Sequence, residues 1–297
     1  MWHSPAMTAA TQRDLITALE LRTADEGDSD HLVGSVPPAE QDSPWNLYGG
    51  HLLGQSLAAV CRTVAPDRLP HSLHGYFLAP GDPSREVDYA VARTRDGRSF
   101  NHRHVLATQG ERPIFELIAS FHLPEDGRVY QVAPPADVPP PEELPGLPEL
   151  VASLDEEPFD SFWTYRPRPV DLRYTNAHFT PTGPTATQGI RAWIRTFEPL
   201  PDDPHLHAAV LAYVADESIS DNVLIPHDVQ WGDEGLAVAS LDHAMWFHRP
   251  FRIDDWLLVD QEPIATGGAR GLSIGRVWDR DGNLVATMTQ EAVMRLG

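Results

Sequence analysis

The chain predicts the same succession of elements twice, and this repeat is the strongest constraint on its fold. A long apolar helix followed by four strands is predicted over residues 48–123 and again over residues 205–296. The clearest match joins residues 76–80 (YFLAP) to residues 246–250 (WFHRP), at a spacing of 170 residues. An apolar helix of this kind needs a sheet wrapped around it to bury its faces. We therefore predict a duplicated α+β unit, in which each copy is an antiparallel sheet around one central helix.

Hydrophobic periodicity places the elements inside each copy. The central helices are predicted at residues 48–64 and 205–218, and a further helix at residues 10–23. Asp-Gly dipeptides, which favour tight hairpin turns, occur at residues 96–97 and 281–282. At the spacing of 170 residues, Ser120 is matched to Gln290. The predicted strands are residues 72–78, 86–95, 99–107, 113–123, 236–243, 256–265, 268–278 and 284–296.

A change in composition separates the two copies. Residues 124–148 contain eight prolines, and residues 125–160 carry ten acidic side chains against one arginine. This composition predicts an extended, solvated linker with a short helix near residues 147–155. The expected organisation is an N-terminal unit at residues 1–125, a linker at 126–159 and a C-terminal unit at 160–297.

Charge and cysteine content exclude several classes of partner. The 297 residues include 43 acidic and 22 basic side chains, all of the latter arginine, for a formal net charge of −21. Nucleic acids and anionic membranes are therefore not expected as partners, because their affinity comes from basic side chains. The single cysteine, Cys61, excludes an intramolecular disulfide. With no signal peptide or membrane span in the pattern, a cytoplasmic protein is expected.

Two kinds of short motif are better explained by ordinary structural roles than by catalysis or metal binding. Residues 271–275 (GLSIG) match the G-x-S-x-G nucleophile elbow, but that motif needs a helix after the serine, and here strands flank it on both sides. The pairs His102/His104 and His205/His207 could hold a metal, since residues i and i+2 share a strand face. No third ligand accompanies either pair, so no metal is expected.

A carboxylate, a hydroxyl and an amide in the C-terminal copy are weak candidates when each is taken alone. Asp216 lies late in the second apolar helix beside Glu217, a position more often held by a solvated charge. Ser240 lies in a predicted strand two residues from Asp242, so these side chains are expected on one face. Gln290 interrupts an apolar strand.

Ordered matches along most of the chain, from about residue 47 to 296, give a more specific signal. The chain resembles the bacterial acyl-CoA thioesterase II family, whose fold is a double hotdog of two tandem helix-and-sheet units. The matching segments are residues 49–55 (GGHLLGQ), 71–82 (HSLHGYFLAPGD), 95–100 (RDGRSF), 114–121 (IFELIASF), 211–216 (LAYVAD), 242–250 (DHAMWFHRP), 269–271 (ARG) and 290–295 (QEAVMR).

The resemblance implies a catalytic trio formed by Asp216, Ser240 and Gln290. Many members have Thr at the position of Ser240, and the hydroxyl is retained here. A carboxylate kept from bulk water can act as general base towards a water, while a hydroxyl and an amide orient it or stabilise an oxyanion. Glu217 is a rival carboxylate beside the base, and Asp242 is the alternative working acid. The chemistry requires no metal or organic cofactor.

On the substrate side the resemblance implies an acyl-CoA, with its acyl chain in an apolar tunnel beside the central helices. Gly49 and Gly50 are candidate oxyanion donors, and His51 stands where the family commonly has Gln. The candidates for the coenzyme A phosphates are surface arginines: Arg98, Arg249, Arg252 and Arg270. A homodimer or higher homo-oligomer is expected.

Three alternatives to the thioesterase hypothesis stay open at this point. The first is a catalytically silent acyl-CoA binding module, against which the intact trio argues. The second is a hotdog-fold enoyl-CoA hydratase, which residues 226–228 (PHD) resemble only faintly, because the preceding residues 220–224 (SDNVL) lack the Gly-Asp-x-Asn-Pro run. The third is an interaction scaffold that uses the acidic linker, supported by composition alone.

Overall fold

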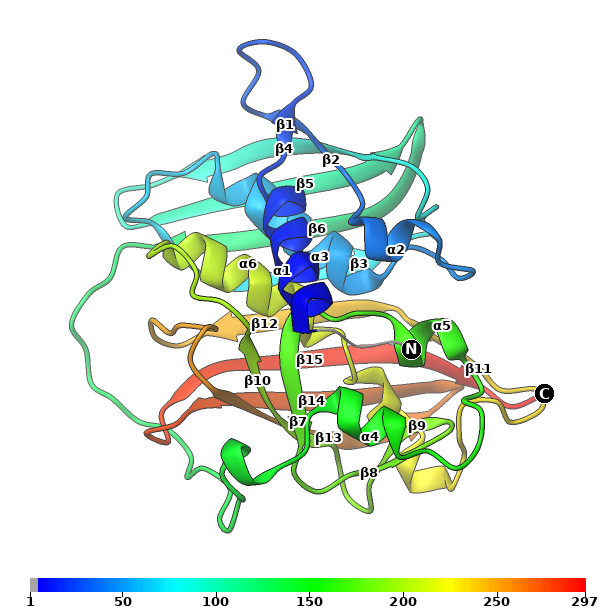
Figure 1. The fold of residues 1–297 in the computed structure, drawn as a ribbon. Helices are drawn as coiled ribbons and strands as arrows, with labels where there is room; N and C mark the ends of the chain where they lie inside the picture. The colour runs from blue at the N-terminus through cyan, green and yellow to red at the C-terminus, as the bar shows by residue number, and fades with distance from the viewer. Residues whose placement is uncertain (1–4) are drawn as a thin grey trace.

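One antiparallel sheet of thirteen strands continues across both halves of the chain in the computed structural model, which describes residues 5–297 (Figure 1). A separate hairpin pairs β8 (His178–Thr180) with β9 (Gly183–Thr185). In the large sheet, β11 (Ala237–Ser240) pairs with β15 alongside β12. The order of the other strands is β1 (Arg22–Thr23), β2 (His31–Gly34), β4 (Val87–Asp96), β5 (Phe100–Gln109), β6 (Arg112–His122), β3 (Leu69–Phe77), β12 (Asp242–Phe247), β15 (Leu284–Arg295), β14 (Arg270–Asp279), β13 (Leu257–Gly267), β10 (Arg191–Thr196) and β7 (Val170–Tyr174).

Two buried helices, α3 (Gly49–Cys61) and α6 (Pro204–Ala215), lie side by side at the centre of the molecule (Figure 1). Their apolar side chains belong to a single core that both halves of the sheet share. Within residues 5–297, no helix is both long enough and apolar enough to cross a membrane. The remaining helices are short or peripheral: α1 (Pro5–Leu19), α2 (Pro38–Gln41), η1 (Pro141–Glu143), α4 (Leu147–Ala152), α5 (Ser161–Tyr165), η2 (Ser220–Val223) and η3 (Ile225–His227).

The duplication predicted from the sequence is confirmed by a local two-fold relation between the halves. The N-terminal strands follow the order β2-β4-β5-β6-β3 and the C-terminal strands the order β10-β13-β14-β15-β12, so β3 and β12 meet at the centre. His74 of β3 pairs with Ala244 of β12, and these residues are 170 positions apart. Since these two residues also correspond to each other in the repeat, the local two-fold axis passes through this pair.

In the next strands outward from the centre, β6 and β15, the spacing between corresponding residues is larger by one. His74 pairs with Ile118 of β6, and Ala244 pairs with Thr289 of β15, so β6 and β15 correspond at 171 residues. Gln290 therefore corresponds to Ala119, and the expected match to Ser120 is wrong. A one-residue offset moves a side chain to the other face of a strand, which is why Ser120 is half-buried while Gln290 is fully buried.

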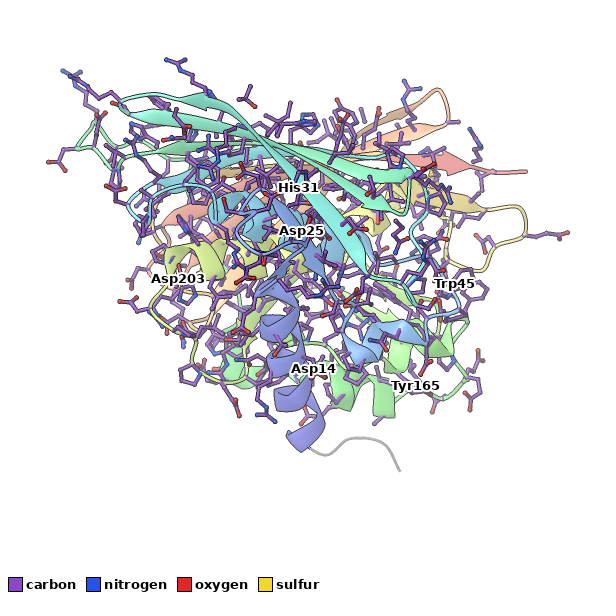
Figure 2. The ribbon with its side chains drawn as sticks, turned by 90° about the horizontal axis from the view of Figure 1, so that it is seen from above. Asp14, Asp25, His31, Trp45, Tyr165 and Asp203 are labelled. Atoms are coloured by element: carbon purple, nitrogen blue, oxygen red, sulfur yellow. The ribbon has the colours of Figure 1, made fainter. Side chains whose placement is uncertain are left out.

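Close approach of the two central helices depends on glycine. A Cβ atom at Gly50 would lie 2.1 Å from the carbonyl oxygen of Tyr213, and one at Gly54 would lie 3.1 Å from that of Ala209. As the residue number rises along α3 it falls along α6, so the helices are antiparallel. In the view from above, Trp45 before α3 and Asp203, the N-cap of α6, accordingly lie on opposite sides of the molecule (Figure 2).

Part of the segment between the halves packs against the protein, which corrects the expectation of a wholly solvated linker. Val138 and Leu144 cover a cluster formed by Trp193, Trp256, Leu258 and Trp278. The indole N–H of Trp193 donates to the carbonyl oxygen of Pro139 at 2.9 Å. Earlier in the segment, Tyr130 is 89% exposed. The proline-rich composition of the segment did not predict that Val138 and Leu144 would pack against the tryptophans.

The helix contact predicts a steric effect that can be measured. Gly50→Ala should lower the free energy of unfolding by about 1–3 kcal/mol, because the added methyl group forces α3 away from Tyr213. Gly127→Ala is the matched control, since no atom lies within 4 Å of a Cβ at Gly127. Urea unfolding of both variants tests this prediction, and equal stability of the two would contradict it.

Candidate active site

The carboxylate of Asp216 joins the ends of the two central helices. Asp216 is the C-cap of α6 and is 8% exposed. Tyr48, at the N-cap of α3, makes no side-chain capping hydrogen bond, so the first N–H groups of α3 need a partner from elsewhere. The backbone N–H of Gly50 donates to the Asp216 carboxylate, and a Cβ at Gly49 would lie 2.6 Å from its Oδ2. Asp216 therefore caps α3 from the neighbouring helix.

One amide group connects this carboxylate to a hydroxyl. Gln290, on β15, is fully buried, and its Nε2 donates to Asp216 Oδ1 at 2.9 Å and to Ser240 Oγ at 2.8 Å. An amide nitrogen carries two hydrogens, so both of its donors are used. The hydroxyl of Ser240 accepts one of these hydrogen bonds and keeps its own hydrogen for another acceptor.

Burial is the main influence on the ionisation of Asp216. It raises the pKa of this carboxyl to about 7, although the donors from Gln290 and Gly50 act in the opposite direction; the nearby Glu217 carboxylate adds to the rise. The side chain also lies at the C-terminal end of α6, where the helix dipole disfavours negative charge. A carboxyl with this pKa is available as a base near neutral pH.

The neighbouring Glu217 is tied into ion pairs and is not a free rival. Its Oε2 lies 2.7 Å from Arg166 Nη2, and its Oε1 accepts from Arg168 Nε. Burial alone would raise the pKa of Glu217, but the two guanidinium groups outweigh it and lower that pKa. Glu217 therefore stays a charged anchor beside the candidate base.

Asp242 does not share a face with Ser240, contrary to expectation. The pairing of β11 with β15 (Ser240 with Ala292) and of β12 with β15 (Ala244 with Thr289) differs by one residue, so the chain has a bulge between them. Asp242 Oδ2 lies 2.9 Å from His74 Nε2 instead, on the face of the sheet that bears the half-exposed His74. The bulge places the two side chains on opposite faces.

The predicted substrate-binding residues are spread over several environments. Gly49 and Gly50 adjoin Asp216, whereas His51 is buried with its Nδ1 3.7 Å from the Glu40 carboxylate. The arginine candidates are also dispersed: Arg98 is exposed in the β4–β5 turn, Arg249 donates to Asn283 and Gln131, Arg252 pairs with Asp202 and Asp254, and Arg270 pairs with Glu291.

Sequence reasoning missed His243, which contacts the amide oxygen of Gln290 through its Nδ1. His243 belongs to β12 and is fully buried, and burial lowers its pKa to about 4. Its place in residues 242–250 is a signal that could have drawn attention to it, because a histidine at a buried strand position needs a polar partner.

A narrow apolar cavity is lined by Ala215 and Glu217, the chain neighbours of Asp216, but not by Asp216 itself. It lies between α6 and the inner face of the C-terminal strands and has a volume of about 20 Å³, room for roughly one water. Its polar lining is confined to Glu217, Ser218 and Gln261. The apolar lining residues are Val170, Leu172, Ile190, Ala192, Ile194, Leu211, Val214, Ala215, Val259, Val277 and Met288.

The other motifs singled out in the sequence do not build a second centre. Ser273 of the G-x-S-x-G motif lies in the middle of β14, without the sharp turn of a nucleophile elbow. His227 is exposed and lies 2.8 Å from Thr266 Oγ1. Within residues 5–297, no group of three or more His, Cys, Asp or Glu side chains is arranged to hold a metal ion.

Comparison with known proteins places the chain in a family. The model of the family described as "Acyl-CoA thioesterase C-terminal domain" matches residues 135–294, and that of the "Acyl-CoA thioesterase N-terminal domain" matches residues 41–122. The chain therefore belongs to the acyl-CoA thioesterase family. Within this family, its similarity to known relatives identifies the chain as a TesB-like acyl-CoA thioesterase II, an enzyme that hydrolyses thioesters.

Curated relatives and solved structures agree with this assignment. Acyl-coenzyme A thioesterase 8 of Homo sapiens is 36% identical over 84% of this chain and 81% of its own length. Acyl-CoA thioesterase 2 of Haemophilus influenzae is 35% identical over 84% of this chain and 87% of its own length. The structure of the acyl-CoA thioesterase II TesB2 from Mycobacterium marinum is 37% identical, with a TM-score of 0.76, over 95% of this chain and 98% of that one. The expected double hotdog fold is confirmed.

Removing the buried acid should change stability in a pH-dependent way. At pH 8 Asp216 is ionised in the folded wild type, although burial raises its pKa to about 7. In the unfolded chain the same carboxyl has a pKa near 4, so its ionisation there costs less free energy. Asp216→Asn should therefore raise the free energy of unfolding at pH 8, by at most about 4 kcal/mol. The gain should shrink as the pH falls from about 7 to 4, where the carboxyl is protonated in both states. Urea unfolding across this range measures it, and a variant less stable than wild type at pH 8 contradicts it.

Proposed function

We propose that this protein hydrolyses acyl-CoA thioesters to a free carboxylic acid and coenzyme A, using a water activated by Asp216, Ser240 and Gln290. The observation that carries the proposal is the single amide of Gln290 donating to both Asp216 and Ser240 beside the start of α3. The names of the relatives, all thioesterases acting on acyl-CoA, supply the substrate class.

Each member of the trio has a separate role in this proposal. Asp216 takes a proton from water, and the resulting hydroxide oxygen bonds to the thioester carbonyl carbon. The carbon–sulfur bond of the tetrahedral intermediate then breaks, and the proton held by Asp216 passes to the coenzyme A sulfur. Because both amide hydrogens of Gln290 are used, its role is to hold the base and the hydroxyl in place. Ser240 has the free O–H that can donate to the water or to the oxyanion.

Gly50 has a revised role in the proposal, while Gly49 stays a candidate oxyanion donor. The N–H of Gly50 faces the carboxylate, so it stabilises the ionised base rather than an oxyanion. The acyl chain would extend from this point along the apolar cavity beside α6, whose side chains must move apart to admit it. Contacts of His51, Arg98, Arg249 and Arg270 with substrate, a cytoplasmic location and a homo-oligomer stay predictions.

Rate measurements test the assignment of the base. Asp216→Asn keeps the size of the side chain but removes its basicity, so kcat should fall roughly 10²–10⁴-fold with little change in KM. Gln290→Ala should lower kcat less, because an amide orients groups but takes no proton. Thiol release from acyl-CoA substrates of several chain lengths provides the assay.

Asp242→Asn is the matched control for these variants. The bulge places Asp242 on the face of the sheet opposite to Ser240, so the turnover of this variant should stay near the wild-type value. Loss of turnover in folded Asp242→Asn together with normal turnover in Asp216→Asn would move the base to Asp242. A well-folded wild type that releases no thiol from any acyl-CoA would overturn the thioesterase proposal itself.

The pH dependence of the reaction gives a separate test. Since Asp216 must be ionised to act, kcat/KM should fall as the pH drops below about 7, the pKa to which burial raises this carboxyl. Asp221 is a useful control, because burial raises its pKa to about 7 as well, while its partner is Trp231 rather than Gln290. The fall in rate at low pH should persist in Asp221→Asn and disappear from the residual activity of Asp216→Asn. The reverse pattern would assign it to Asp221.

A further inference from the structure

His243 makes a contact that bears directly on the orientation of the Gln290 amide. Its Nδ1 lies within hydrogen-bond distance of Gln290 Oε1, on the side of the amide away from Asp216 and Ser240. Both side chains are fully buried. The contact comes from β12, while Asp216 comes from α6 and Ser240 from β11, so a separate element holds the oxygen end of the amide.

The chemistry of the two groups fixes which atom of His243 carries the proton. An amide oxygen only accepts hydrogen bonds, so Nδ1 must be the donor. His243 Nε2 is buried without a hydrogen-bond partner among residues 5–297. An unprotonated Nε2 leaves no buried N–H group unsatisfied there. Burial lowers the pKa of His243 to about 4, so the ring is neutral at the pH where a carboxylate base works.

The Gln290 amide has two orientations that differ by a rotation of half a turn. In the other orientation its oxygen would face the carboxylate of Asp216, and its nitrogen would face His243. That arrangement removes a donor from the base and places two acceptor oxygens together. We propose that His243 is a positioning residue for the hydrolysis: its Nδ1–H holds the amide oxygen of Gln290, so that both amide hydrogens face Asp216 and Ser240. This role rests on the proposed function.

Losing the contact should change the base through Gln290. The hydrogen bond from Gln290 lowers the pKa of Asp216, opposing the effect of burial. When the amide is free to rotate, that pKa should rise further. The other charged groups that influence these sites are Glu217 and Arg166 around Asp216, and Asp242 and His74 around His243. None of them is altered by a substitution at His243.

Leucine and asparagine provide a matched pair of substitutions, because they have nearly the same shape and only asparagine carries an amide that can donate a hydrogen bond. His243→Leu removes the donor and should lower kcat roughly 10- to 100-fold, with KM little changed. The fall in rate at low pH should also move to higher pH. His243→Asn can present its amide N–H near the position of Nδ1, and should restore most of kcat and the wild-type pH profile.

Two outcomes of this comparison overturn the proposal. One is a folded His243→Leu with wild-type kcat and pH profile. The other is a His243→Asn variant that is as impaired as His243→Leu, since that would assign the loss to packing alone. His207→Asn is the control for removal of a buried histidine, because His207 lies in the first turn of α6 and accepts from the N–H of Ile253. Its kcat should equal that of the wild type.

A double-mutant cycle shows whether His243 acts through Gln290. In a Gln290→Leu background there is no amide to hold, so adding His243→Leu should change kcat less than twofold. A further loss as large as in the single variant would overturn the proposal.

An independent readout separates this inference from the thioesterase proposal. The pKa of Asp216 can be followed by ¹³C NMR of its carboxyl carbon, without substrate. It should be higher in His243→Leu than in wild type and close to wild type in His243→Asn. If wild type releases no thiol but these pKa differences are observed, the proposed function fails and the positioning of Gln290 by His243 stands. Equal values in all three proteins overturn the positioning role.

Discussion

The contact between the start of α3 and the end of α6 is the interaction on which the rest of the site depends. Glycine at position 50 lets the two helices approach until Asp216 of α6 caps α3. The same approach buries the carboxylate and raises its pKa to about 7. From the sheet, the Gln290 amide then donates one hydrogen bond to this carboxylate and the other to Ser240. A carboxylate held this way is stabilised as an ion by few donors, which leaves it basic enough to act on water.

Much of the fold could be predicted from the sequence, because apolar periodicity and the match of residues 76–80 to 246–250 are local patterns. The short strands β2 and β10 were missed, since four to six residues carry little periodic signal. The bulge near Leu241 could not be predicted, because one extra residue is invisible until the partner strand is known. For that reason Asp242 was wrongly expected to share a face with Ser240.

The site shows a similar division. Asp216, Ser240 and Gln290 were named through the resemblance to a family, and no local pattern would have selected them from the other acidic and polar side chains. His243 lay inside one of the matching segments and was overlooked, because its partner is 47 positions away. Contacts over such separations are set by strand register, which follows from the whole sheet. Resemblance therefore supplied the candidate groups, and the structure supplied the contacts between them.

The two-fold relation also explains how a duplicated unit came to have one site of this kind. The positions in the N-terminal half that correspond to Ser240 and Gln290 are Pro70 and Ala119, which lack the hydroxyl and the amide. The start of α6 is capped by its own Asp203, whereas α3 leaves its start open for Asp216. If the two halves were identical copies, each copy would need both an acid at the end of its helix and an uncapped start of that helix. In a single chain the two halves can differ, so the candidate site combines the open start of α3 from the first half with Asp216, Ser240 and Gln290 from the second.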